Sequence, residues 1–564
     1  MSRFKKKSSA RQLKNTNRFE RKAEKISEFW LISILFVLPL IFTNFYFNIL
    51  PTKYITVCIA SLVLILYYAY IRLSEGGEAG FSFAGIREWL AAMNRIDLCV
   101  LIFIAVCILS TLTAFPYGYQ AFFGNEGRHN GLLLMLFYGA SYFIVRKHAL
   151  FRKRIVMLFL AAGLFICLFG ISDYFDLDLL HFKKNMFSDQ RSIYISTIGN
   201  INTYTAFVGF VITLSGTLFM TKKAALGSRE SGKAFGELIF LYLCMTVGFM
   251  ALAMGNSDNG YLTLAAFFGF LPLAVWKKRR GFRRYLIALA SYFTVIVLVG
   301  MINDLYSDRV LGISGIYEYI SNFRGMPHIA LLFWALAAGF YGYDFKRIKE
   351  GDEGEMGILP RALWLILILI LAGIVFYLIY AANTDPDVRL RKWGGLTNYL
   401  VFNDKWGTYR GYIWKATIED YLKLPLIHKI FGTGPDTFGI YMVSKNIERY
   451  MDSVSRTGKY FDNAHNEYLH LLFTLGPIAL LSYIGAIAGS VFTGIRAWMK
   501  GAEEEEGRYL LAFAFLLLAH SVQATVNLYL PITAPIAWAF MILIVNMGEK
   551  IPIQEEKKKQ EDKK

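Results

Sequence analysis

The chain is divided into about fourteen apolar runs, each close to the length that a helix needs to cross a bilayer. Inside a bilayer only helices and closed barrels satisfy every backbone hydrogen bond. With 55% hydrophobic and 18% charged residues among 564, little room is left for a large soluble domain. We therefore predict an all-α polytopic membrane protein with about 12–14 transmembrane helices. The runs lie near residues 27–49, 54–71, 98–115, 131–145, 155–171, 203–220, 236–254, 261–276, 285–302, 329–343, 363–381, 467–495, 509–527 and 536–548.

Clusters of Lys and Arg between these runs set the expected orientation, because short cytoplasmic loops carry the excess of positive charge. The clusters are residues 1–26, 146–154, 222–233, 277–284, 346–361 and the tail from Lys550. With fourteen spans they all fall on the cytoplasmic side. The net charge of +18 is split among them rather than gathered on one folded face, so we expect no nucleic acid partner.

The predicted organisation has five parts. A basic cytoplasmic tail (1–26) precedes a transmembrane helix bundle (27–381) and one large extracytoplasmic loop (382–465). C-terminal transmembrane helices (466–548) and a charged cytoplasmic tail (549–564) follow. The five cysteines all lie in apolar runs without paired or metal-type spacing, which indicates neither a disulfide framework nor a zinc site.

Histidine and arginine residues outside the membrane are the candidates for chemistry. His465 stands where the large loop meets a membrane helix, and its imidazole can act as a general base near neutral pH. Arg128, Arg191 and Arg410 lie in predicted extracytoplasmic loops, and a guanidinium binds two diphosphate oxygens at once. Each residue alone is more often a helix cap, a salt bridge or a lipid contact, so the functional interpretation depends on their convergence.

Several sequence pieces resemble the O-antigen ligase and O-antigen polymerase superfamily, bacterial membrane enzymes that transfer lipid-diphosphate-linked glycans. They are GRHNG (127–131), GNIN (199–202), YRGYIWKA (409–416), FGTGPDTF (431–438) and AHNEYLHLLFTLG (464–476), within a resemblance that covers about residues 98–548. Two positions depart from the family pattern: Ile201 stands where proline is usual, and Asp258 stands where a cation is common.

The resemblance implies an inverting, metal-independent glycosyltransferase in the bacterial cytoplasmic membrane. The donor would be a glycan on undecaprenyl diphosphate, and the acceptor a hydroxyl of another glycan or surface molecule. By this resemblance His465, Arg410 and Arg191 would be catalytic, with His465 as base and the arginines on the diphosphate. Arg128, Asn466, Tyr409 and Trp414 would bind substrate, with membrane lipids as further partners and no cofactor.

Alternatives stay open at this stage. A transporter or flippase of lipid-linked oligosaccharide would also have many spans, but its polar groups should gather near the bilayer midplane. Asp176 and Asp178 could in principle hold a metal, although loop solvation explains them better. The tyrosine and tryptophan side chains could belong to an interfacial aromatic belt. Polymerase and ligase share a donor site, and the sequence does not separate them.

Overall fold

The computed structural model describes residues 2–44, 46–75, 83–184, 186–187, 190–223, 229–349, 354–385, 396–458, 460–500, 505–528 and 530–561. Within these ranges the chain is almost entirely helical, and the one sheet is the antiparallel pair β1 (Tyr194–Ile195) and β2 (Gly199–Asn200). The prediction of an all-α polytopic membrane protein is confirmed.

The first half of the chain forms α1 (Ser2–Ile32), the π-helix η1 (Ser33–Val37), α2 (Leu38–Leu40), α3 (Ile49–Glu75), α4 (Phe83–Ala91), α5 (Arg95–Thr113), α6 (Gly118–Phe123), α7 (Leu132–His148), α8 (Lys153–Tyr174), α9 (Ile201–Thr221), α10 (Arg229–Met254) and α11 (Gly260–Val275). The second half forms α12 (Arg279–Leu305), η2 (Ser307–Arg309), α13 (Gly315–Ser321), α14 (Met326–Tyr343), α15 (Phe345–Lys349), α16 (Ile358–Thr384), α18 (Thr397–Leu400), α19 (Trp406–Lys423), α20 (Leu426–Phe431), α21 (Phe438–Lys445), α22 (Ile447–Thr457), α23 (Glu467–Lys500), α24 (Glu505–Gln523), η4 (Ala524–Val526) and α25 (Ala534–Glu561).

Fewer of these helices reach spanning length than the sequence suggests. Among the described residues nine helices are long and apolar enough to cross a membrane: α3, α5, α8, α9, α10, α12, α16, α23 and α24. The pair α13 and α14, bent by 76°, makes ten if it counts as one span. The apolar runs at Gly260–Val275 and Ala534–Glu549 also form helices, but these are shorter than the others. The remaining expected spans correspond to shorter or interrupted helices.

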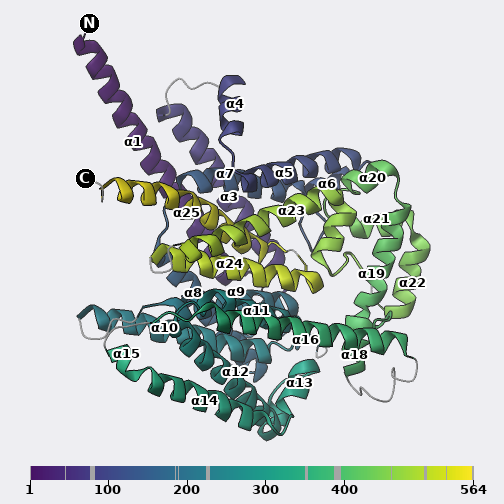
Figure 1. Ribbon diagram of the computed structural model, residues 1–564. Helices are drawn as coiled ribbons and strands as arrows, with labels where there is room; N and C mark the ends of the chain where they lie inside the picture. The colour runs from purple at the N-terminus through teal and green to yellow at the C-terminus, as the bar shows by residue number, and fades with distance from the viewer. Residues whose placement is uncertain are drawn as a thin grey trace.

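The long helices lie alongside one another, and the two ends of the bundle differ (Figure 1). Helices α1 and α25 leave the bundle at one end, here called the terminal end. Helices α18–α22 form a separate layer at the opposite end; this layer, residues 396–458, is here called the cap. The cap makes up most of the described part of the predicted 382–465 loop. Residues 386–395 of that loop, including Trp393, lie outside the described residues.

Contacts between distant loops bring several of the predicted outer segments together. The backbone N–H of Leu311 donates to the carbonyl of Tyr174 at 2.9 Å. The hydroxyl of Tyr399, in the cap, donates to Asp258 at 2.7 Å. Three predicted outer segments and the cap therefore share one end, as the count of fourteen runs requires.

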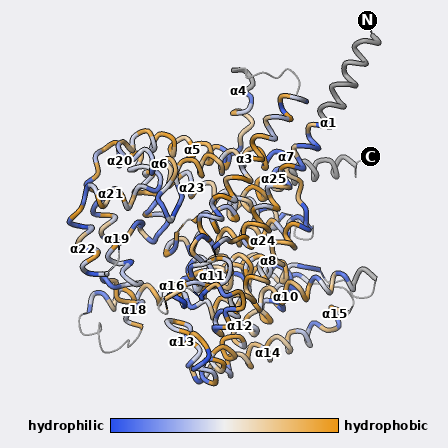
Figure 2. The backbone as a smooth tube through the Cα atoms, turned by 180° about the vertical axis from the view of Figure 1, so that it is seen from behind, coloured by the Kyte–Doolittle hydropathy of each residue, from blue (hydrophilic) through white to orange (hydrophobic). Residues whose placement is uncertain are grey.

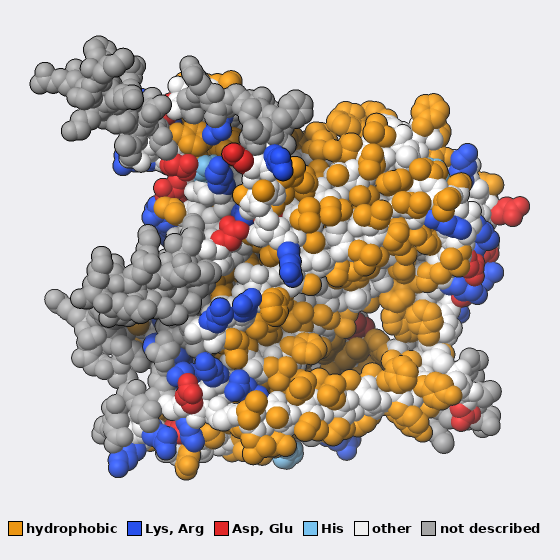
Figure 3. Space-filling view, turned by 45° about the horizontal axis from the view of Figure 1, so that its top comes forward, with side chains coloured by type: hydrophobic (Ala, Val, Ile, Leu, Met, Phe, Trp, Pro, Cys, Tyr) orange, Lys and Arg blue, Asp and Glu red, His pale blue; other side chains and the backbone are white. Residues whose placement is uncertain are grey.

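The surface separates by polarity in the way a membrane protein requires. Hydrophobic residues dominate the middle of the bundle, and hydrophilic ones concentrate in the cap and at the ends (Figure 2). On the face in Figure 3 a broad hydrophobic band covers the centre, and Lys and Arg gather mainly on the side of the termini. Helix α16 is the extreme case, since none of its most apolar stretch is buried within the protein. Such a surface is stable only against lipid.

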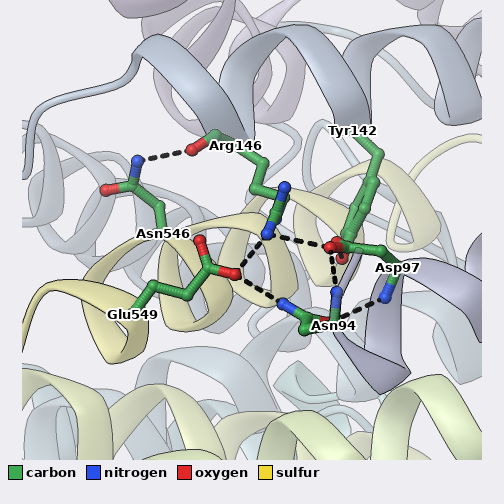
Figure 4. Close-up of polar contacts among 6 residues, drawn as sticks. All are labelled: Asn94, Asp97, Tyr142, Arg146, Asn546 and Glu549. Carbon is green, nitrogen blue, oxygen red and sulfur yellow. Dashed lines mark hydrogen bonds and ion pairs between the residues drawn. The ribbon is translucent and has the colours of Figure 1, made fainter. Parts of the chain in front are cut away.

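Ion pairs tie the helices together at the terminal end (Figure 4). Asp97, in the first turn of α5, is fully buried, accepts a hydrogen bond from Tyr142 at 2.8 Å and pairs with Arg146 at 2.8 Å. Arg146 also pairs with Glu549 of α25. A buried carboxylate needs such partners to offset its lost hydration. The network joins α5, α7 and α25 at the end away from the cap.

Candidate functional site

The FGTG turn of the cap packs directly on a break in α23. The N–H groups of Thr433 and Gly434 donate to the carbonyls of Phe473 and Thr474 at 3.2 and 2.9 Å. Gly476 has φ 79° and interrupts the helix just before Pro477. A Cβ on Gly432 would lie 2.2 Å from the Thr474 carbonyl oxygen. Glycine is therefore required by contact as well as by backbone conformation.

The same turn holds the 124–131 loop. Asp436 is buried, and its Oδ2 accepts hydrogen bonds from the backbone N–H groups of Asn125 at 2.6 Å and Asn130 at 3.0 Å. These two residues flank Arg128 and belong to the GNEGRHNG segment. Two motifs about three hundred residues apart thus form one unit through a single carboxylate oxygen.

Arg128 makes a bidentate ion pair with Asp462. Its Nε and Nη2 donate to Oδ2 and Oδ1 at 2.8 and 3.0 Å. The Asn463 side chain also donates to Asp462, and its Oδ1 accepts the backbone N–H of His465 at 2.8 Å. A continuous set of polar contacts therefore runs from Asp436 to the backbone of His465.

His465 occupies a left-handed backbone conformation with φ 49°, between the cap and α23. Its ring is partly buried, with its edge against Phe461 at 6.0 Å between ring centres. Asn466 follows as the N-terminal cap of α23, since its Oδ1 accepts the N–H groups of Tyr468 and Leu469 at 3.0 and 3.1 Å. The role of Asn466 in the structure is thus to begin the helix behind His465.

Arg410 lies at the start of α19, where regular helix begins. Gly407, Thr408 and Tyr409 all have left-handed dihedral angles, and Arg410 Nη1 donates to the carbonyl of Gly407 at 2.8 Å. Its Nε is buried and has no hydrogen-bond partner among the described residues. The Arg410 side chain is only partly buried, so its other guanidinium N–H groups are accessible to an external acceptor.

The structure brings two of the three predicted arginines to His465. Burial, and next the positive charges of Arg410 and Arg128, lower the pKa of His465 to about 3. Burial also lowers the pKa of Arg410, while the charge of Asp258 acts in the opposite direction. Burial alone would raise the pKa of Asp462, but Arg128 outweighs it and holds that pKa below its ordinary value. At neutral pH the site thus contains a neutral imidazole beside two guanidinium groups.

Arg191 lies apart from this arrangement. Its Nη2 donates to the carbonyl of Lys183 at 3.2 Å, within its own loop. No interaction with His465 or Arg410 is found for it within the described ranges. Tyr194, three residues later, is close enough to act on the charge of Arg128, so this loop borders the site without placing Arg191 in it. The predicted convergence therefore holds for Arg128 and Arg410 only.

The aromatic candidates contribute to packing in the cap. Trp414 lies 5.1 Å from Trp406 between ring centres and 6.2 Å from Phe402. Tyr409 packs against the cap core around Phe438 and Phe473. Their proposed contact with sugars stays a prediction, since the observed neighbours are other apolar side chains.

GNIN (199–202) meets the segment around Asp258 (SDNG, 257–260) at Asn202. Its Oδ1 accepts the hydroxyl of Ser257 at 2.7 Å, and its carbonyl accepts Asn527 Nδ2 at 3.0 Å and Asn259 Nδ2 at 3.3 Å. Asn259 in turn accepts the hydroxyl of Thr205 at 2.6 Å. This polar junction joins α9, α11 and the end of α24 on the cap side of the bundle.

Residues 310–484 match the family model described as O-Antigen ligase. This segment includes the cap, Arg410, Asp436, Asp462, His465 and the first part of α23. The O-antigen ligase match supports the superfamily to which the sequence motifs point, and with it a ligase or polymerase type of function in surface glycan biosynthesis. A search of curated proteins finds no match for the chain.

Asp436, Asp462 and the Asn202 junction were not predicted. The signal for Asp462 was its place three residues before His465, and for Asp436 its place in a glycine turn. Nothing in the sequence says which hydrogen-bond donors either carboxylate would contact. Asp176 and Asp178 have left-handed φ angles of 49° and 40°, and within the described residues no group of three or more metal-ligating His, Cys, Asp or Glu side chains is found.

Proposed function

We propose that the protein transfers a glycan from a polyprenyl-diphosphate donor to an acceptor hydroxyl. The observation that carries the proposal is the neutral His465 imidazole, whose pKa the charges of Arg410 and Arg128 lower. His465 and Arg410 lie in the segment that matches the O-antigen ligase family. Neither ring nitrogen of His465 makes a hydrogen bond to the residues that the structure describes. The imidazole is thus available to an incoming hydroxyl.

In the proposed step the acceptor oxygen attacks the anomeric carbon from the face opposite the diphosphate. The new carbon–oxygen bond forms as the bond to the diphosphate oxygen breaks, which inverts the anomeric configuration. The proton of the acceptor hydroxyl passes to His465, and the electron pair leaves with the polyprenyl diphosphate. Arg410 faces the negative charge that grows on this leaving group. No metal ion takes part.

Electrostatics favours an anionic donor at this position. Burial, and next the charges of the two guanidinium groups, keep His465 in its neutral form in the free protein. A bound diphosphate would offset their repulsion and raise the pKa of His465 toward neutrality, which is where a general base works best. Donor binding would thus prepare the base.

The direct test is glycosyl transfer by the purified protein in lipid nanodiscs, with a lipid-linked donor and a glycan acceptor. We expect His465→Ala to lower turnover by about 10² to 10⁴ and to leave donor binding nearly unchanged. His328→Ala, which removes an exposed histidine at the start of α14, is the matched control. Full transfer by a folded His465→Ala protein would refute the general-base role.

Deletion of the gene separates polymerase from ligase. Single repeat units in place of long surface polysaccharide would identify a polymerase. Full-length chains that stay unattached would identify a ligase. Loss of surface chains, together with accumulated lipid-linked precursor on the inner face, would favour the flippase alternative over both.

A further inference from the structure

We propose that Asp436 and Asp462 are positioning residues for His465, and that Arg128 acts as their structural partner rather than as a ligand of the donor diphosphate. This inference rests on the proposed function, since it assigns the two carboxylates a place in that reaction. It gives the two arginines of the site different roles: Arg128 stabilises the structure of the site, and Arg410 binds the substrate.

First, Asp436 fixes the conformation of the 124–131 loop. A single oxygen of Asp436 accepts both Asn125 and Asn130 N–H groups, so the carboxylate closes the loop around Arg128. Burial raises the pKa of Asp436 to about 7, and the two N–H bonds oppose this rise. A carboxylate is tolerated in this apolar place because it satisfies two backbone donors that the loop cannot satisfy itself.

The second step passes from this loop to His465. Arg128 is about three-quarters buried, with its side chain 23% exposed, and both of its contacting nitrogens are engaged by Asp462. Asp462 also receives the Asn463 amide, and Asn463 accepts the His465 N–H. A non-glycine residue in the left-handed region needs such support, because that conformation is sparsely populated without it.

The two arginines therefore differ in what they can offer a ligand. Arg128 is neutralised by a bidentate partner that occupies its Nε–Nη2 edge, so a diphosphate could bind that edge only by displacing Asp462. Arg410 has a protein hydrogen bond to one carbonyl and a buried Nε without a partner in the described part of the chain. The geometry thus assigns donor contact to Arg410 and loop geometry to Arg128.

The test compares variants that remove one charged partner with a double variant in which the two charges are exchanged. Asp462→Ala and Arg128→Ala should each lower kcat at least tenfold with a change in donor KM below twofold. The exchanged pair Asp462→Arg with Arg128→Asp should recover at least tenfold over the weaker single variant, since it restores the ion pair. Asp436→Asn should retain most activity and Asp436→Ala should not, because one amide oxygen can still accept both N–H groups. Asp452→Ala, an outward carboxylate on α22, is the control and should be unchanged.

A readout without substrate keeps this inference separate from the proposed function. We expect His465 to react with diethyl pyrocarbonate at least threefold faster in Asp436→Ala and Asp462→Ala than in the wild type, as measured by peptide mass spectrometry. His328, exposed at the start of α14 and away from this loop, provides an internal reference peptide. Unchanged His465 reactivity in folded variants would overturn the positioning role even if no transfer is detected. A donor KM that rises in step with the loss of kcat in Arg128→Ala, without recovery by the exchanged pair, would make Arg128 a donor ligand instead.

Discussion

Arg128 and Asp462, 334 positions apart in the chain, form a bidentate ion pair, and Asp462 stands three residues before His465. The pair joins the loop ahead of α7 to the segment that leads into α23. It explains why a short arginine motif and a histidine motif occur in one chain: each supplies half of a single structure at the cap end of the bundle.

Arg410 should be the cation whose loss affects donor binding most. Arg410→Ala is expected to reduce kcat/KM by about 10² to 10³, with a higher donor KM, because it removes a charge-assisted contact to the leaving diphosphate. Arg410→Lys should restore only a small part, since a point charge replaces a planar fork. Steady-state kinetics with varied donor measure both effects. Arg456→Ala, in an exposed pair with Asp452, is the control, and equal losses in the two variants would contradict the assignment.

The pH dependence of the free and donor-bound protein should differ. The folded-state pKa of His465, about 3, lies below the ordinary histidine value, so the imidazole stays neutral through the physiological range. We expect kcat/KM, which reports the free enzyme, to show no acid limb from His465 near pH 6.5. The pH profile of kcat reports the donor complex. There the acid limb should appear at a higher pH, because the diphosphate stabilises the imidazolium form of His465.

Replacement of Arg410 by glutamine provides a check on the cause of that shift. Removal of one positive neighbour should raise the pKa of His465 in the free protein, and the acid limb of kcat/KM should rise with it. Histidine-selective NMR on the wild type and Arg410→Gln would follow the same titration directly. An unchanged His465 titration would show that burial alone sets its pKa.

The contact between the glycine turn and α23 should be intolerant of a methyl group. Gly432→Ala and Gly476→Ala are each expected to lower the free energy of unfolding by about 2–4 kcal/mol, since the new Cβ would meet backbone at 2.2 and 2.1 Å. Gly458→Ala shares the positive φ but has no atom within 4 Å of its Cβ, so it measures backbone strain alone. Thermal unfolding in detergent should rank Gly458→Ala as the mildest of the three.

The cap should face the outside of the cell membrane. Ser455→Cys, on the exposed side of α22, is expected to react with an impermeant maleimide in cells with permeable outer layers, and Lys147→Cys, at the terminal end, only after lysis. The reason is that the Lys and Arg clusters occupy the terminal end, which the positive-inside rule assigns to the cytoplasm. The reverse labelling pattern would invert the topology.

Transfer should proceed without a divalent ion. The proposed leaving-group contacts are guanidinium nitrogens, so excess chelator should leave turnover within about twofold of the untreated rate. Loss of activity that magnesium or manganese restores would contradict this prediction. It would direct attention to Asp176 and Asp178.

The sequence alone determined the class of fold and the places where chemistry could occur. Hydropathy is a local property, so runs of spanning length predicted helices at α3, α5, α8 and α9 without any knowledge of their neighbours. The motif around His465 likewise lies within a few consecutive residues, and its position at the start of a membrane helix follows from the apolar run after it.

Only the tertiary structure decided which charged groups meet. Arg128, Arg191 and Arg410 looked equivalent as basic residues in predicted outer loops. In the structure Arg128 pairs with Asp462, Arg191 bonds within its own loop, and the Nε of Arg410 has no partner in the part of the chain that is described. Ion pairs depend on distances between segments far apart in the chain, and these distances are set by helix packing and by the contact of Gly432 with α23. Local sequence patterns do not depend on such long-range contacts. They therefore indicated the residues of the site but not their partners.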